Sequence, residues 1–200
     1  MILDNEINVK QFGCYGDSTH DDTQNLQKAI NFAYSLENAK NYNSYKILIP
    51  KGKYKVTSEL RLTSSTLTSS EYSNIQIEGM GQGSSVLISE FEDDGNVLYL
   101  NASSKFTLKD ISFKNISGND VNITAVKIDG ASMNVDITNV FTYNFYVGFN
   151  TYVCVGNLTN CFANNCNCGF LTNGTATNLI NCYASQCSKK DEVNAYEGCG

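Results

Sequence analysis

The chain has 200 residues, of which 42% are hydrophobic, enough for one domain with its own core and too apolar for an intrinsically disordered chain. Its formal net charge of −6 argues against a nucleic-acid-binding protein, which needs a basic face. No apolar run approaches the ~20 residues of a membrane span, and no signal peptide is visible at the N-terminus. We therefore expect neither nucleic acid nor a membrane among its partners.

A helix is predicted over about residues 22–36. Its apolar residues recur at helical spacing and form a single stripe: Leu26, Ala29, Ile30 and Ala33. Asp21 or Asp22 is the expected N-cap, and Gln24 resembles the second half of a capping box with Asp21. We expect residues 1–45 to form an N-terminal cap segment that carries this helix.

Short extended segments follow. Residues 46–50 are predicted as a strand, a second extended piece starts at Tyr54, and residues 74–79 alternate apolar and polar positions as a half-buried strand does. The Ser- and Thr-rich residues 57–73 fit a linker and an exposed strand equally well.

The C-terminal half is a repeat with a period of 21 residues, which gives the turns 125–145, 146–166 and 167–187. A looser copy at 106–115 aligns with 135–144 at an offset of 29. Aligned positions keep their chemistry in columns: Ile128, Phe149 and Phe170; Ile137, Leu158 and Leu179; Val140, Cys161 and Cys182; Phe145, Cys166 and Cys187; Asn139, Asn160 and Asn181.

A period of this length, with extended segments and no helical stripe, predicts a β-solenoid over residues 46–200. Stacked strands lie ~4.8 Å apart, so an Asn at a bend can bond to the Asn of the next turn. Such ladders account for the excess of Asn, which numbers 26 in this chain. The Cys residues of the repeat fall in apolar columns, which favours thiols packed as small hydrophobes over a zinc site.

The N-terminal motifs resemble those of the pectate lyase superfamily, which includes phage tailspike depolymerases. The shared motifs, in order, are Phe12-Gly13, Gly16-Asp17, Asp21-Asp22-Thr23, Pro50-Lys51-Gly52-Lys53-Tyr54 and Gly79-Met80-Gly81. Ser18 stands where the family often has Gly. The resemblance implies an all-β fold, a right-handed single-stranded parallel β-helix whose open end is covered by the N-terminal helix. Because Cys199-Gly200 resembles the start of the turn at Cys168-Gly169, we expect the β-helix to continue beyond residue 200.

The same resemblance implies a protein that binds and cleaves polysaccharide, by hydrolysis or by β-elimination. It also implies a homotrimer, located in a virion tail or outside the cell. The alternative is a non-catalytic β-helix that only binds glycans or builds a phage tail or surface assembly. The sequence leaves this choice open, because it shows no recognisable catalytic set.

Asp110 and Asp136 are the candidate catalytic carboxylates, since hydrolysis of a glycosidic bond uses a pair of them. The repeat places their backbones about 11 Å apart, one rung and three residues from each other. Asp110 also falls in the Asn column, so the alternative is a residue that stabilises a turn. For elimination the chain offers little, since Arg61 is its only Arg and His20, beside the helix start, its only His.

Tyr143, Tyr146, Tyr152 and Lys127 are the candidate substrate-binding residues. They lie on or between the repeat turns, where aromatic rings can stack on sugars and a Lys can face a groove. For the aromatic columns Phe141, Phe162 and Tyr183, packing between turns is an equal alternative. No cofactor or metal is expected; the acidic run at Glu90, Glu92, Asp93 and Asp94 could bind Ca²⁺, with a solvated loop as the alternative.

Overall fold

The computed structural model describes residues 5–37, 44–63, 74–101, 105–117, 121–129, 133–152, 155–172 and 176–187. Helix α1 spans Thr23–Glu37 and a short 3-10 helix, η1, spans Val9–Phe12. The strands are β1 Glu6–Asn8, β2 Asp17–Asp21, β3 Tyr45–Leu48, β4 Gly52–Val56, β5 Leu60–Thr63, β6 Asn74–Glu78, β7 Ser85–Ser89, β8 Gly95–Asn101, β9 Lys105–Asn115, β10 Ile123–Asp129, β11 Met133–Tyr143, β12 Val147–Thr151, β13 Val155–Thr159, β14 Phe162–Asn164, β15 Cys168–Thr172, β16 Ala176–Ile180 and β17 Tyr183–Ser185.

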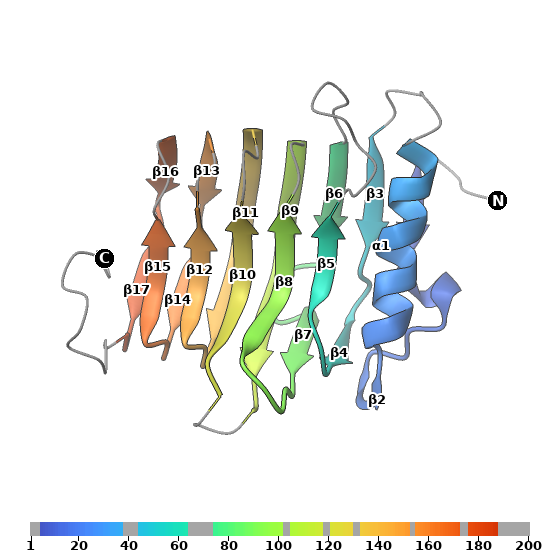
Figure 1. Cartoon of the computed structure of the whole chain (residues 1–200), viewed down its shortest axis with the longest axis horizontal. Coiled ribbons are helices and arrows are strands. Elements are labelled where there is room, and N and C mark those ends of the chain that lie inside the picture. The colour runs from blue at the N-terminus through green and yellow to red at the C-terminus, as the bar shows by residue number, and fades with distance from the viewer. Residues whose placement is uncertain are drawn as a thin grey trace.

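The strands stack into three parallel ladders that form the three faces of a solenoid (Figure 1). Face 1 runs β1-β3-β6-β9-β11-β13-β16, and face 2 runs β2-β4-β7-β9-β11-β14-β17. Face 3 is the separate sheet β5-β8-β10-β12-β15. The long strands β9 and β11 bend and contribute to faces 1 and 2. This is the predicted right-handed parallel β-helix.

Left-handed backbone turns the chain at the corners of the later rungs. Between faces 1 and 2 the turning residues are Asp110, Asn139, Asn160 and Asn181, with φ of 51–56°. Asn144, Asn165 and Gln186 do the same between faces 2 and 3. Asn and Asp tolerate this conformation better than other residues with a side chain. The amide of Asn181 donates to Oδ1 of Asn160 at 2.6 Å and that of Asn165 to Oδ1 of Asn144 at 3.0 Å, so the predicted Asn ladders are confirmed.

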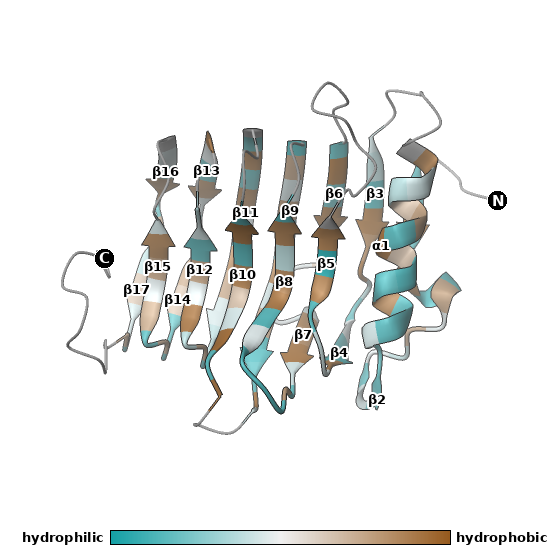
Figure 2. Cartoon of the chain, viewed as in Figure 1, coloured by the Kyte–Doolittle hydropathy of each residue, from teal (hydrophilic) through white to brown (hydrophobic). Residues whose placement is uncertain are grey.

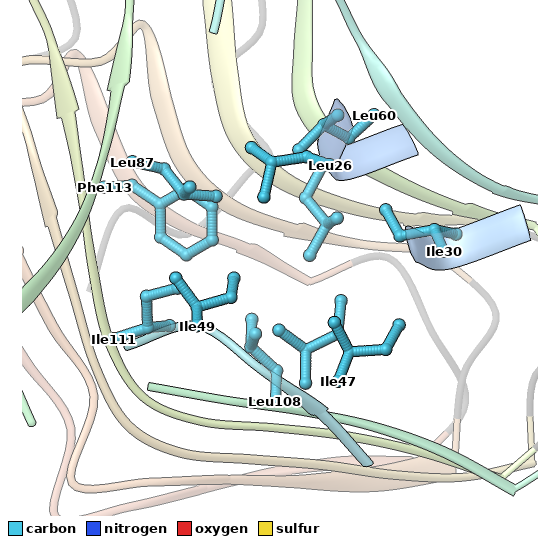
Figure 3. Close-up of a pocket in the computed structure, with 11 residues that line it drawn as sticks. Leu26, Ile30, Ile47, Ile49, Leu60, Leu87, Leu108, Ile111 and Phe113 are labelled. Carbon is cyan, nitrogen blue, oxygen red and sulfur yellow. The ribbon is translucent and has the colours of Figure 1, made fainter. Parts of the chain in front are cut away.

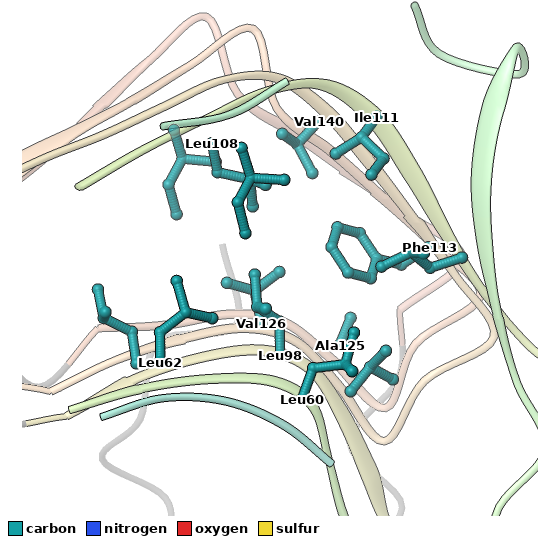
Figure 4. Packing of buried hydrophobic residues seen from close by; sticks show 14 of the residues in the cluster. Leu60, Leu62, Leu98, Leu108, Ile111, Phe113, Ala125, Val126 and Val140 are labelled. Carbon is teal, nitrogen blue, oxygen red and sulfur yellow. The ribbon is translucent and has the colours of Figure 1, made fainter. Parts of the chain in front are cut away.

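The core fills the space between the three faces. Apolar residues lie beside apolar residues from strand to strand (Figure 2), and those of opposite faces point toward one another (Figure 4). One predicted column is right for Phe149 and Phe170, which pair, and wrong for Ile128: Phe149 pairs with Val126, while Ile128 pairs with Thr151. Phe149 lies 23 residues after Val126 along face 3, whereas Asn157 lies 21 residues after Asp136 along face 1. The difference arises because the chain from Val126 to Asp136 has two residues more than the chain from Phe149 to Asn157.

Helix α1 covers the N-terminal end of the solenoid (Figure 1). Its stripe residues Leu26 and Ile30 are buried and point at the first rungs, including Ile47 (Figure 3). The gap between them has room for only about 10 Å³ and has an entirely apolar lining, which is too small and too apolar to hold an ordered ligand. The space under the helix is therefore packed core.

The N-terminal motifs join this helix to the first rung. Asp22 is buried and accepts hydrogen bonds from the backbone N–H of Tyr15 at 2.6 Å and of Gly16 at 2.8 Å. Asp21 accepts from the backbone N–H of Thr23 at 2.9 Å. The hydroxyl of the buried Tyr54 donates to the carbonyl of Pro50 at 3.0 Å. These motifs thus serve architecture. The segment predicted as a cap also supplies β1 and β2, which pair with β3 and β4.

In the described part of the chain, no helix is long and apolar enough to cross a membrane.

Candidate functional site

A strip of polar side chains runs along the outside of face 3. Arg61, Tyr99, Lys127 and Asn150 occupy equivalent positions on β5, β8, β10 and β12. Side chains alternate between the two sides of a strand, and the residues on either side of each strip position are buried or nearly so: Leu60, Leu62, Leu98, Leu100, Val126 and Ile128. The strip therefore faces solvent because its neighbours build the core. We call it the face 3 strip.

Two cations flank the ring of Tyr99 within this strip. Cζ of Arg61 lies 5.7 Å from the ring centroid, and Nζ of Lys127 lies 5.8 Å from it. Contacts of this kind contribute roughly 0.5–1 kcal/mol at exposed sites. The amide of Asn101 donates to the Tyr99 hydroxyl at 3.1 Å. The ring is thus held on the face by contacts from both neighbouring rungs.

Two carboxylates beside the strip balance the formal charges of its two cations. Oε1 of Glu59 lies 2.7 Å from Nε of Arg61, and Oδ2 of Asp129 lies 3.9 Å from Nζ of Lys127. A guanidinium has five N–H donors and an ammonium has three. Each cation therefore keeps donors beyond those that one carboxylate can take. The Arg61 side chain is 63% exposed and that of Lys127 32%, so those donors can reach a ligand.

Helix α1 fixes the first strand of face 3. The amide of Gln27 donates to the carbonyl oxygen of Arg61 at 2.9 Å, and its oxygen accepts the Arg61 backbone N–H at 2.8 Å. Gln27 thus makes the two hydrogen bonds that a neighbouring strand would make, which blocks this sheet edge. It also sets the position of Arg61 relative to Tyr99.

The predicted substrate-binding residues fall on two faces. Lys127 belongs to the face 3 strip. Tyr146 and Tyr152 stand directly before and after β12, and Tyr152 is 49% exposed. Tyr143 lies on face 2, where Nζ of Lys114 sits 6.0 Å from its ring centroid. Three of the four therefore lie on or beside face 3.

In the aromatic column on face 2 the facing ring surfaces are occupied, although Tyr183 at its last described position is 63% exposed. The Phe141 and Phe162 rings stack at 5.2 Å, and the Phe162 and Tyr183 rings stack at 5.3 Å. A sugar needs a free ring surface to stack on, and here each ring covers its neighbour. This arrangement favours the interpretation of this column as packing between turns.

The two candidate catalytic carboxylates lie in different surroundings. Asp136 pairs with Thr107, as the offset of 29 predicts, and lies on face 1. It lines an open cleft of about 320 Å³, and the amide of Asn157 donates to its Oδ1 at 3.2 Å. Asp110 turns the chain between faces 1 and 2 and is absent from the residues that line this cleft. Catalysis by this pair stays a prediction.

The acidic run is divided among separate partners. Glu90 forms an ion pair with Lys55, and Asp94 accepts hydrogen bonds from the backbone and side-chain amides of Asn122 at 2.6 and 3.3 Å. Within the described ranges, no three His, Cys, Asp or Glu side chains come together as metal ligands. His20 stacks on Tyr15 at 4.1 Å and bonds to Asp17 at 2.7 Å beside the helix start.

Arg61 and Tyr99 were not predicted as site residues. They precede the 21-residue repeat, and the spacings along the strip are unequal. The sequence does contain a signal that Tyr99 and Lys127 are equivalent. Residues 97–100 and 125–128 share one pattern, in which Tyr99 and Lys127 are the polar positions among buried apolar residues.

The fold and the strip define the class: a capped parallel β-helix with an ordered polar and aromatic outer face. The family model described as "Rhamnogalacturonase A/epimerase, pectate lyase-like" matches residues 6–190. The chain belongs to this family, and the resemblance expected from its motifs is confirmed.

Individual relatives agree with this assignment. The chain is 32% identical over 131 residues to mannuronan C5-epimerase AlgE2 of Azotobacter vinelandii, a match covering 62% of this chain and 12% of that protein. Among solved structures it resembles ORF18 of Geobacillus virus E2, with a TM-score of 0.61, 18% identity, and coverage of 96% of this chain and 44% of that one. It also resembles the A-module of mannuronan C-5 epimerase AlgE4 of A. vinelandii, with a TM-score of 0.56, 20% identity, and coverage of 89% and 49%. The two structural matches are likenesses of fold.

Proposed function

We propose that this β-helix binds an acidic polysaccharide along face 3. The observation that carries the proposal is the Tyr99 ring between Arg61 and Lys127, at 5.7 and 5.8 Å. The relatives named as mannuronan epimerases act on mannuronan, a polysaccharide. An acidic substrate for this chain is consistent with two cations on one strip of a protein whose net charge is −6.

The geometry favours recognition of carboxylates over stacking of sugar rings. The two cations lie two rungs apart, ~9.6 Å along the solenoid axis. A polyuronate has a carboxylate on every sugar, so one bound chain can reach both cations. The cations approach the Tyr99 ring from its two neighbouring rungs, which leaves to the ligand the ring edge and the O–H donor of a hydroxyl that accepts from Asn101. Tyr146 and Tyr152 would extend the contact along β12.

Binding is tested by titrating polymannuronate into the protein in a calorimeter. Losing a hydrogen bond to a charged group costs roughly 1.5–3 kcal/mol, which is about tenfold or more in affinity. We expect that loss for Arg61→Ala and for Lys127→Ala, and weaker binding as salt is raised. Lys28→Ala is the matched control, because it removes the same charge from helix α1. Equal affinities for Arg61→Ala and Lys28→Ala would refute the proposal.

For the whole protein we propose polysaccharide cleavage or modification, with non-catalytic glycan adhesion as the second candidate. The observation that supports adhesion is that both described carboxylates beside the strip, Glu59 and Asp129, are paired with its cations. The two are separated by incubating the protein with polymannuronate and polygalacturonate. Unsaturated uronates report elimination, new reducing ends report hydrolysis, and guluronate signals in the NMR spectrum report epimerisation. Binding without any of these products supports adhesion.

We also propose a homotrimer associated with a virion. Support comes from the tailspike resemblance and from the fold shared with the viral protein ORF18. Light scattering of the purified protein measures the first property, and a mass three times that of the chain is the expected result.

A further inference from the structure

We infer that the cleft on face 1 binds a neutral sugar unit, independently of the face 3 strip. The cleft holds about 320 Å³ and is lined by Lys105, Asn134, Asp136, Val155, Gly156, Asn157 and Asn178. This volume is at the lower end of the roughly 300–1,000 Å³ typical of small-molecule sites, which suits one pyranose rather than a long segment of polymer.

A β-bulge coincides with the cleft. The register between β11 and β13 shifts between Met133 and Val135, and Asn134 has a left-handed backbone with φ of 61°. A bulge puts one extra residue in a strand and bends it, and bulges recur next to functional sites. Across from it, a Cβ on Gly156 would lie 2.0 Å from the carbonyl oxygen of Val135. Glycine therefore lets the two strands approach closely at the base of the cleft.

Side-chain hydrogen bonds are aligned toward Asp136. The amide of Asn178 donates to Oδ1 of Asn157 at 3.0 Å, and the amide of Asn157 donates to Oδ1 of Asp136 at 3.2 Å. Asp136 can accept further bonds because a carboxylate has about four lone-pair sites. The cleft thus presents carboxylate and amide acceptors fixed in place on successive rungs.

The charges of the lining select a neutral ligand. Lys105 and Asp136 contribute one positive and one negative charge. The Asp136 carboxylate would therefore repel an anion, and the Lys105 ammonium would repel a cation. The remaining polar lining is Asn amides, which both donate and accept. Sugar hydroxyls also do both. A neutral pyranose matches this lining, whereas the face 3 strip places two cations around one aromatic ring, that of Tyr99.

Saturation-transfer NMR with the 200-residue protein tests this inference. The probes are methyl α-D-glucopyranoside, methyl α-D-mannopyranoside and methyl β-D-galactopyranoside, with sodium glucuronate as the charged counterpart. We expect at least one neutral pyranoside to bind more tightly than glucuronate. Asp136→Ala and Lys105→Ala should each raise its dissociation constant about tenfold. Lys105 is exposed, so its variant tests the site even if loss of Asp136 disturbs the strand.

Two controls separate this cleft from other surfaces. Asn165→Ala removes the same kind of rung-to-rung amide bond, 3.0 Å to Asn144, at another corner of the solenoid, and should leave pyranoside binding unchanged. Arg61→Ala should weaken polymannuronate binding and leave pyranoside binding unchanged. The inference is overturned if none of the pyranosides binds, if binding survives both cleft variants, or if Arg61→Ala abolishes it.

Discussion

The side-chain amide of Asn139 donates a hydrogen bond to the Asp110 carboxylate at 2.5 Å, and both residues have left-handed backbone. Asp110→Asn keeps an acceptor and a residue that tolerates this backbone, so we expect it to cost no more than about 1 kcal/mol of unfolding free energy. Asp110→Ala loses both and should cost about 3 kcal/mol. Urea unfolding measures the difference, and equal losses would contradict this role for the side chain.

Catalysis by Asp110 and Asp136 makes a separate prediction. In the protein that shows turnover, Asp110→Asn and Asp136→Asn should each abolish product formation while the urea midpoint stays close to that of the wild type. A general acid or nucleophile needs the carboxyl group, which the amide lacks. Unchanged turnover in either variant removes that residue from the catalytic set.

Much of the fold could be predicted because its information is local or periodic. The stripe of Leu26 and Ile30 predicts the helix, and the Asn column predicts the bends. The face 3 strip could not be found this way, because Arg61, Tyr99 and Lys127 come from rungs of unequal length. Alignment at a constant period therefore does not bring them together. For the same reason a constant period places Ile128 in the wrong column. The cleft depends on a bulge at Asn134, which alternation of apolar residues does not reveal.

Gly79→Ala tests the close packing at the corner between faces 1 and 2, and Gly95→Ala is its control. A Cβ on Gly79 would lie 2.2 Å from the carbonyl oxygen of Asp110, whereas at Gly95 the nearest atom would be a ring carbon of Phe91 at 3.4 Å. Overpacking of this kind costs typically 1–3 kcal/mol, and we expect Gly79→Ala to fall at or above the top of that range. Gly95→Ala should cost under about 1 kcal/mol. Thermal unfolding compares them, and a Gly79→Ala protein as stable as the Gly95→Ala control would contradict the packing described.

Stability should depend on pH through Asp21. Partial burial acts to raise the pKa of this carboxyl, but hydrogen bonds from Thr23 and Thr57 outweigh burial and hold the pKa below its ordinary value. The folded state thus favours the ionised form. Its contribution is fully present above the unfolded-state pKa of about 3.9 and is lost as pH falls through the lower folded-state pKa.

The test for Asp21 measures the midpoint temperature of thermal unfolding at pH values from about 6 down to about 2. We expect Asp21→Asn to have a lower midpoint than the wild type at pH 6 and a smaller decline on acidification. Thr57→Val, which removes one donor, should fall between the two. Parallel curves for wild type and Asp21→Asn would rule out the linkage.

Buried thiols should resist alkylation. Burial raises the pKa of Cys161 to about 12 and that of Cys166 to about 11, so at pH 8 few of these groups are thiolates, the reactive form. We expect iodoacetamide to label both only when the protein is unfolded, and mass spectrometry of the digested protein reads each site. Labelling of either site in the folded protein as fast as in urea would contradict its burial. Cys154 and Cys199 lie outside the described residues.

The first and the last described rungs differ in how their inner side chains are covered. At the N-terminal end α1 packs on the first rungs, and Leu26 is 2% exposed. In the column of Ile137, Leu158 and Leu179, the first two are 0% exposed and Leu179 is 45% exposed. In a stack where each rung contacts only its neighbours, local opening is easiest at the rung whose inner side chains are least covered. In the 200-residue chain, amide hydrogens should therefore exchange faster in β16 and β17 than in β6, which is the consequence of the exposed Leu179 for local stability.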